Sequence, residues 1–470
     1  MSLPVASNII TTGNALRQHL ISRFRCSEEF IGNFSIPRKL PRAAGFFRVG
    51  DIICYGQCSS ATLAKSVTEL LHDVSQHEMV NGNSIHLPFD PAQVVDNLCN
   101  ERYIAKNAGV LRSVSGGGTI RSLYYRMRPL MPVRIRKHFQ RLYLRGWQRI
   151  PFPQWPVDRT IERLNEHLLV LSMQSQNLVR IPFIWFWPEG YGSSAVMTHD
   201  VETLAGRDFC SRLMDINDSF CIKSSFQVVP EERYPVPESY LESIRSRGFE
   251  VNVQDLNHDG HLFRDHAEFL RRAERINAYR RQWGAQGFRS AVLYRNTDWY
   301  DGLEFPYDMS IPNVAHLDPQ RGGCCTVFPF MIGKTVELPV TTIQDYSLFH
   351  ILKDYSTSLW EQQISLIREQ HGFINVIIHP DYIIDHASQG VYKALLRYLC
   401  DLRSTGDVWF ALPRDVAEWW RLRSEMTLVR SGDTWRIEGN GSDRARVAYA
   451  TFIDGKLEYE MPPSLQRSGS

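Results

Sequence analysis

The 470-residue sequence lacks the features that mark exported or membrane-spanning proteins. No stretch approaches the ~18 consecutive apolar residues of a spanning helix. The first twenty residues are interrupted by polar side chains and contain no apolar core followed by a cleavage site, so we expect no secretory signal. The nine cysteines include no CxxC pair and are irregularly spaced, which argues against a disulfide framework. We therefore expect a cytoplasmic protein.

An excess of charge of one sign is also lacking. The chain has 53 Lys and Arg against 51 Asp and Glu, a formal net charge of +2, so no global charge favours nucleic acid and we predict no nucleic-acid partner. Apolar residues make up 43% and charged residues 22%, which is ordinary for a folded protein. The length suffices for two or three domains.

One local segment departs from this balance. Residues 121–149 contain nine Lys or Arg, five interleaved aromatics and no acid. Such a segment can lie on an anionic membrane surface, which would make the protein peripheral to the membrane and would suit a lipid-linked substrate. The alternative, which we favour, is a solvated helix that bridges two domains, because charge runs are usually solvated faces.

Apolar runs with strand character alternate with helical patterns in the second half of the chain, as in parallel α/β folds. The expected strands are residues 193–200, 222–229, 249–256, 287–295, 305–310, 335–342, 373–380 and 407–413, and the expected helices include 237–248, 264–284, 346–370 and 392–404. Seven or eight strands with intervening helices favour a closed (β/α) barrel over an open sheet.

The chain is thus predicted to have four parts. Residues 1–120 form an N-terminal α+β region in which 46–56 is a strand followed by a loop, and residues 121–187 form a basic helical connector. Residues 188–426 form the barrel. Residues 427–470 form a small antiparallel β appendage with a tail, since alternating apolar and polar residues are punctuated there by turn sequences.

Ionisable or amide side chains recur where the predicted strands end, which is where parallel α/β barrels carry their active sites. The sequences concerned are THDVE (198–202), QDLNHDG (254–260), GFRS (287–290), YDMS (307–310) and VIIHP (376–380). A single buried polar residue is commonly satisfied by backbone groups, but repetition at strand after strand indicates a functional site.

The order of these five sequences resembles the motifs of polysaccharide deacetylases, carbohydrate esterase family 4, over about half of the chain. That family opens with an aspartate-rich strand end, in one branch DVD or DVE, followed by a motif with two histidines four residues apart. An arginine, an aspartate and a histidine after an apolar strand complete the set. The resemblance implies a (β/α)7-type barrel and a divalent metal, zinc above all, that assists hydrolysis of N-acetyl groups on a carbohydrate.

The same resemblance implies roles for individual residues. Asp200 would be the general base and His379 the acid that protonates the leaving amine. Arg289 would orient Asp200, and Asp308 would orient His379.

The implied metal ligands are Glu202, His258 and the residue at position 254. Here the chain departs from the family, because Gln254 stands where the first metal histidine is expected. An amide oxygen is a weaker zinc ligand than imidazole. The sequence is therefore compatible with an active site that has an unusual ligand set, with a weak metal site, and with an inactive relative that binds carbohydrate or a protein partner.

Overall fold

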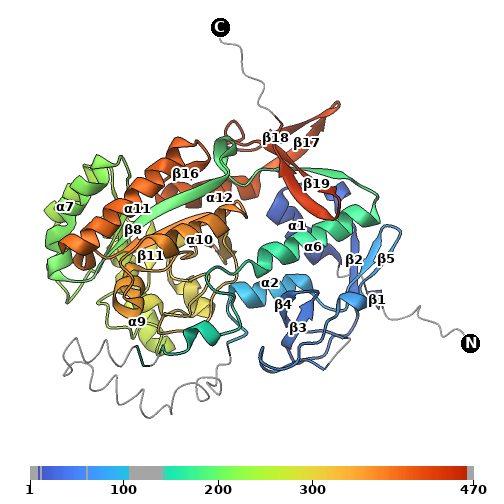
Figure 1. Cartoon of the computed structure of the whole chain (residues 1–470), viewed down its shortest axis with the longest axis horizontal. Helices are drawn as coiled ribbons and strands as arrows, with labels where there is room; N and C mark the ends of the chain where they lie inside the picture. The colour runs from blue at the N-terminus through green and yellow to red at the C-terminus, as the bar shows by residue number, and fades with distance from the viewer. Residues whose placement is uncertain (1–8, 11–12, 60–61, 105–140, 143, 463–470) are drawn as a thin grey trace, which may run out of the picture. The chain divides into compact units, whose positions relative to one another are not determined.

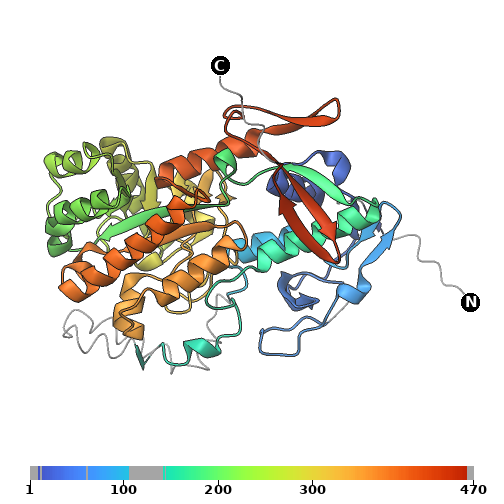
Figure 2. The ribbon, with the colours of Figure 1, turned by 45° about the horizontal axis from the view of Figure 1, so that its top comes forward.

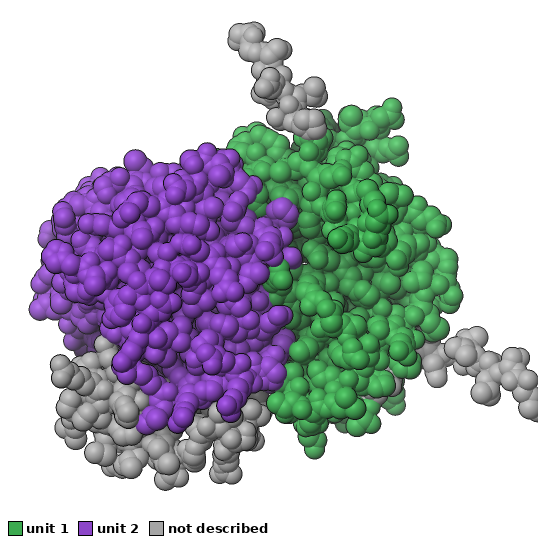
Figure 3. Space-filling view, viewed as in Figure 1, with its two compact units in different colours: residues 1–98, 159–192, 418–470 green, residues 99–158, 193–417 purple. Residues whose placement is uncertain are grey.

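The computed structural model of the chain describes residues 9–10, 13–59, 62–104, 141–142 and 144–462 (Figure 1). Two compact units are present, coloured separately in Figure 3. Unit 1 comprises residues 1–98, 159–192 and 418–470, and unit 2 comprises residues 99–158 and 193–417. The division at residues 120, 187 and 426 expected from sequence remains a prediction. Most of the basic segment 121–149, together with the two alternatives for it, lies outside the described residues.

Unit 2 is built on a curled sheet with seven parallel strands in the described part of the chain. They are β8 (Ser193–Val201), β9 (Ser225–Val228), β10 (Glu250–Gln254), β11 (Gly287–Arg289), β12 (Tyr307–Asp308), β14 (Thr335–Glu337) and β15 (Phe373–Ile378), in the spatial order β14-β12-β11-β10-β9-β8-β15. Strand β13 (Phe330–Ile332) pairs antiparallel with β14, and β16 (Val408–Phe410) pairs parallel with the start of β8. All nine positions of β8 are buried, as expected for a strand covered on both faces.

Side-chain hydrogen bonds bridge the seam between β14 and β15. The chain after β14 continues in the direction of β15, and the Thr341 hydroxyl donates to the Phe373 carbonyl at 2.8 Å and accepts the Asn375 N–H at 2.9 Å. The Thr342 hydroxyl donates to the Asn375 carbonyl at 2.9 Å. The predicted α/β class with a (β/α)7-type barrel is confirmed by this topology.

Helices cover the outside of this sheet (Figures 1 and 2). They are α7 (Leu204–Ser219), α8 (Glu238–Arg245), α9 (His266–Trp283), α10 (Ser358–Arg368), α11 (His386–Ser404) and the first part of α12 (Pro413–Glu425), with short helices at Ala291–Leu293, Thr297–Gly302 and Pro380–Ile383. Side-chain caps fix three of their starts: Thr203 accepts from Gly206 N, Asp265 from Glu268 N, and Asp385 from Ala387 N and Ser388 N.

Several sequence predictions in unit 2 are wrong in extent. The strands expected over 305–310 and 335–342 are only Tyr307–Asp308 and Thr335–Glu337. In place of the helix expected over 346–370, the chain forms a π-helix, η8 (Ser347–Leu352), and then the separate helix α10. The π-helix ends because Lys353 adopts a left-handed conformation with φ 58°. The strand expected over 287–295 ends at Arg289, since Val292 and Leu293 also have positive φ and turn the chain.

Unit 1 contains both helices and strands, in agreement with the expected α+β character. Its elements are β1 (Ile9–Ile10), α1 (Gly13–Phe24), β2 (Asn33–Pro37), β3 (Gly45–Val49), β4 (Ile52–Gly56), β5 (Met79–Asn81), β6 (Ser84–His86), most of α2 (Pro91–Cys99), α6 (Thr160–Ser175), β7 (Arg180–Ile184), β17 (Thr427–Ser431), β18 (Thr434–Glu438), β19 (Val447–Ile453) and β20 (Lys456–Glu460). The sheets have the orders β1-β2-β6-β5, β20-β19-β7, β3-β4 and β17-β18.

The structure revises two details of the sequence-based description of unit 1. Residues 46–56 are a hairpin of β3 and β4 and not a strand with a loop, because Gly50, with φ 60°, permits a two-residue turn between Val49 and Ile52. The C-terminal strands are confirmed as antiparallel, but β19 also pairs with β7 and so belongs to a three-stranded sheet. Within the described residues, no helix has the length and apolar character needed to cross a bilayer.

Candidate functional site

The candidate site lies at the C-terminal ends of the parallel strands. Asp200 is the penultimate residue of β8, and Glu202 follows that strand directly. Gln254 and Arg289 end β10 and β11 in register with each other. His379 follows the last residue of β15. Because parallel strands end at the same rim of a barrel, these residues converge although they are up to 179 positions apart in the sequence.

Asp200 and Arg289 form a fully buried ion pair. The Arg289 Nη1 lies 3.0 Å from Asp200 Oδ1 and 3.2 Å from the Thr198 hydroxyl. Their side chains are 5% and 0% exposed. Burial raises the pKa of Asp200, and the Arg289 guanidinium opposes that rise. Arg289 therefore holds one oxygen of the Asp200 carboxylate.

Glu202 lies between two imidazoles. Its Oε1 is 2.8 Å from His258 Nε2 and 3.4 Å from His379 Nε2. Burial alone would raise the pKa of Glu202, but the charges of both rings hold it well below its usual range. Burial lowers the pKa of His258. The neighbouring Glu202 carboxylate more than offsets that effect, so the pKa of His258 is raised overall. The structure thus brings His258 and Glu202 together, as predicted.

The loop that carries His258 has an unusual backbone. Asp255 and His258 adopt positive φ values of 51° and 57°, which cost free energy for residues other than glycine. Arg272 anchors the loop through both Asp259 oxygens at 2.8 and 2.9 Å, and the Asp259 carboxylate accepts the His261 N–H. His261 itself is exposed, with its side chain 52% accessible. The strained backbone directs His258, and not His261, toward Glu202.

His379 is held by Asp345, a residue that the sequence analysis missed. Asp345 Oδ1 is 2.6 Å from His379 Nδ1, and Asp345 Oδ2 accepts the His379 backbone N–H at 2.8 Å. Both residues are buried. Burial lowers the pKa of His379, but Asp345 and Glu202 together raise it well above its usual range. The predicted pairing of His379 with Asp308 is therefore wrong.

Asp308 lies instead beside a second carboxyl group in the barrel wall. It is in register with Glu337 on the neighbouring strand, and its two oxygens accept the Ser310 N–H and hydroxyl at 2.9 Å each. Burial raises the pKa of both Asp308 and Glu337. Asp308 is therefore buried against Ser310, and Asp345 reaches His379 because the segment after β14 runs along β15.

Gln254 contacts both carboxylates of the site. Its Nε2 donates to Asp200 Oδ2 at 3.2 Å and to Glu202 Oε1 at 3.5 Å. The residue is 1% exposed, and its Oε1 has no hydrogen-bond partner among the described residues. Such an unsatisfied buried oxygen is uncommon in folded proteins. The predicted ligand position 254 therefore does face the centre of the site.

The side chains present fit a divalent cation. Ligand atoms of Asp200, Glu202 and His379 all lie within 4.8 Å of one another, and His258 adds a fourth donor next to Glu202. Carboxylate oxygen and imidazole nitrogen are zinc ligand types, and the Gln254 oxygen is a further free acceptor at the same place.

Aromatic rings that the sequence analysis did not single out surround His379. The Tyr382 ring lies 4.9 Å from that of His379 and 4.9 Å from that of His350, and Tyr346 lies 5.5 Å from Tyr382. Tyr346 directly precedes the π-helix as its N-cap and His350 lies within that helix, an irregularity frequent at functional sites. In the sequence, Tyr346 and His350 closely follow Asp345, and Tyr382 closely follows His379. This proximity becomes informative only once the structure identifies Asp345 as a partner of His379.

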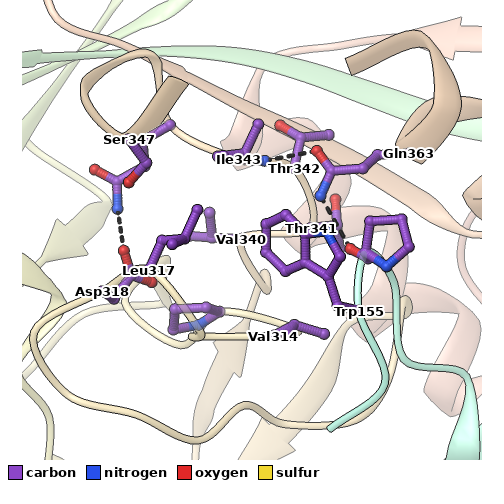
Figure 4. A pocket seen from close by; sticks show the side chains of 13 residues that line it. Trp155, Val314, Leu317, Asp318, Val340, Thr341, Thr342, Ile343, Ser347 and Gln363 are labelled. Atoms are coloured by element: carbon purple, nitrogen blue, oxygen red, sulfur yellow. Dashed lines mark hydrogen bonds between the residues drawn. The ribbon is translucent and has the colours of Figure 1, made fainter. Parts of the chain in front are cut away.

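A pocket of unit 2 lies beside the segment that delivers Asp345 (Figure 4). Residues 340–344 of that segment line it, with Trp155 and Asp318 also among the lining residues. Asp318 accepts a hydrogen bond from the Gln344 amide at 3.0 Å, and burial raises its pKa to about 6. None of the strand-end residues of the candidate site lines this pocket.

No protein-family model and no curated protein matches the chain. Solved structures do. A protein of Mycobacterium smegmatis assigned as a polysaccharide deacetylase is 18% identical, with 53% of this chain and 98% of that chain covered and a TM-score of 0.41. One from Pseudomonas aeruginosa with the same assignment is 14% identical, with 50% and 93% covered and a TM-score of 0.40. A mutant family 4 pseudoenzyme with restored enzymatic activity is 12% identical, with 48% and 67% covered and a TM-score of 0.32. Over about half of its length, the chain is similar to polysaccharide deacetylases.

Proposed function

We propose that the protein is a metal-dependent hydrolase that removes N-acetyl groups from a carbohydrate. The observation that carries this proposal is a set of two hydrogen-bonded pairs on either side of Glu202. In one pair Arg289 holds Asp200, and in the other Asp345 holds His379. Amide hydrolysis needs a base that takes a proton from water and an acid that gives one to the departing amine. Both kinds of group are present in one buried site.

Asp200 is the proposed base. Arg289 holds one carboxylate oxygen, so the other is presented to the site in a fixed direction. Burial raises the pKa of Asp200, which makes its carboxylate a better proton acceptor than an exposed aspartate. Arg289 acts here as a positioning residue.

His379 is the proposed acid. Asp345 engages Nδ1, which leaves Nε2 to carry a proton toward the substrate. Asp345 and Glu202 raise the pKa of His379 against the effect of burial, which favours the protonated ring that a general acid needs. Asp345 is thus the positioning residue for His379.

A divalent ion, when bound, would polarise the acetyl carbonyl and acidify water. Glu202 and His258 would hold it with the Gln254 side-chain oxygen, and zinc suits the nitrogen and carboxylate donors best. The substrate is proposed to be a sugar polymer or its precursor because of the motif resemblance, and the aromatic rings of Tyr346 and Tyr382 offer apolar faces to a sugar ring. A lipid-linked form of that precursor remains a prediction from residues 121–149.

Acetate release from N-acetylated oligosaccharides, with zinc or cobalt added, tests the proposal. Asp200→Asn and His379→Ala should each lower the rate by about 10²-fold or more, the scale of general acid–base catalysis. His261→Ala is the matched control, since His261 is exposed beside the same loop and should leave the rate unchanged. No acetate release from any N-acetylated sugar with loaded wild-type protein would refute turnover.

The second candidate function is a carbohydrate- or partner-binding barrel without turnover. It is favoured by the Gln254 amide, which already satisfies Asp200 and Glu202 without an ion. Oligosaccharide binding that is unaffected by metal and by Asp200→Asn, without acetate release, would support this alternative.

A further inference from the structure

We propose that Gln254 makes metal loading of this site reversible, with its side-chain amide alternating between a donor orientation without the ion and an acceptor orientation with it. This rests on the metal-binding part of the proposed function but not on turnover. Two observations at the same residue carry it: the hydrogen bonds of its nitrogen, and the lack of a hydrogen-bond partner for its oxygen among the described residues.

The amide nitrogen of Gln254 stabilises both carboxylates by donating hydrogen bonds to them, as a cation would by its charge. Nε2 lies between Asp200 Oδ2 and Glu202 Oε1, at 3.2 and 3.5 Å. Two carboxylates that face each other in a buried site need a positive or donor group between them, because uncompensated charges there are costly. The amide hydrogens supply a donor between the carboxylates, in addition to Arg289 at Asp200 and the two imidazoles at Glu202, so the ion-free site is electrostatically acceptable.

The amide oxygen shows that this orientation is not ideal. Gln254 Oε1 is buried and has no hydrogen-bond partner among the described residues. An unsatisfied buried acceptor typically costs about 1–3 kcal/mol. Rotation of the amide by half a turn does not relieve this cost without an ion, because the oxygen would then face Asp200 and Glu202.

A divalent ion reverses the preference. With positive charge near Glu202 and His258, the carboxylates no longer need the amide hydrogens, and the oxygen gains a partner. Amide rotation and ion binding are therefore linked. Because the ion must displace an interaction that already satisfies the site, its affinity is lower than with a histidine at position 254, and the ion exchanges.

Thermal unfolding of the full chain, with chelator and with increasing zinc, tests this linkage independently of activity. Wild-type protein should melt at the same temperature with chelator and without added metal, and should be stabilised only at high zinc concentrations. Gln254→Glu has nearly the same shape but no amide hydrogens. It should melt at a lower temperature in chelator, and zinc should restore it.

Gln254→His supplies the matching gain of function. Its zinc affinity, measured by calorimetry, should exceed that of wild type by about tenfold or more. The inference is overturned if Gln254→Glu melts like wild type in chelator, or if Gln254→His binds zinc no more tightly than wild type. If zinc responses follow the inference but no variant releases acetate, the proposed turnover fails and the linkage stands.

Discussion

Asp345 holds His379 at two points, with Oδ1 2.6 Å from the ring Nδ1 and Oδ2 2.8 Å from the backbone nitrogen. This double contact fixes both the tautomer and the direction of the imidazole, so that Nε2 faces Glu202. Asp345 reaches His379 because the chain after β14 runs parallel to β15. The hydrogen bonds of Thr341 and Thr342 to β15 hold it there.

The first prediction concerns this contact. Asp345→Asn removes the negative charge but keeps the shape, so the pKa of His379 should fall and the proposed hydrolysis should slow by about 10²-fold or more. The pH titration of the His379 ring by NMR gives a readout that a purely structural change would not shift in this direction.

Asp308→Asn is the matched control, because Asp308 is equally buried but contacts Ser310 and not His379. It should leave the His379 titration unchanged. If Asp308→Asn lowers the His379 pKa and Asp345→Asn does not, the assignment of the two aspartates must be reversed.

The second prediction concerns the buried Asp200–Arg289 pair. Arg289→Met leaves the Asp200 carboxylate buried without its cation, which should lower the free energy of unfolding by about 3–5 kcal/mol in urea denaturation. The double variant Asp200→Asn with Arg289→Met removes both charges and should recover part of that loss. A double variant at least as unstable as Arg289→Met would argue against an ion pair.

The third prediction concerns Glu250 at the start of β10, far from the site in the barrel. Burial raises the pKa of Glu250 from 4.5 to about 7, against the hydrogen bond from Tyr307. Between these two pH values the unfolded chain releases the proton while the folded protein retains it, so stability falls as pH rises through this window. Above pH ~7 the loss is complete and amounts to at most about 3 kcal/mol.

Glu250→Gln should therefore match wild type near pH 4.5 and exceed it in melting temperature at pH 8. Urea denaturation across the same pH range measures the difference in free energy. Parallel pH profiles for the two proteins would show that the Glu250 proton is not linked to folding.

Much of the barrel could be predicted because periodicity and motif order act together. The runs 193–200 and 373–380 are long, apolar and end in motif residues, and both are strands within two residues of the expected ends. Short strands were harder. Strand β11 ends at Arg289, since positive φ at Val292 and Leu293 depends on tertiary contacts that the apolar sequence does not reveal.

The site could be predicted in part. Asp200, Glu202, Gln254, His258, Arg289 and His379 converge as their positions at strand ends suggested. Asp345 could not be found in this way, because it follows an irregular extended segment and not a strand. Asp308, by contrast, ends a strand but points to Ser310, and a strand-end position alone does not determine where a side chain points.

Zinc binding at equilibrium tests the central claim most directly. Calorimetric titration of metal-free wild-type protein at zinc concentrations up to the millimolar range should give one ion per chain, and Glu202→Ala and His258→Ala should each abolish it, while His261→Ala should not. Wild-type protein that takes up no zinc, or uptake that survives Glu202→Ala, would contradict a metal site centred on Glu202.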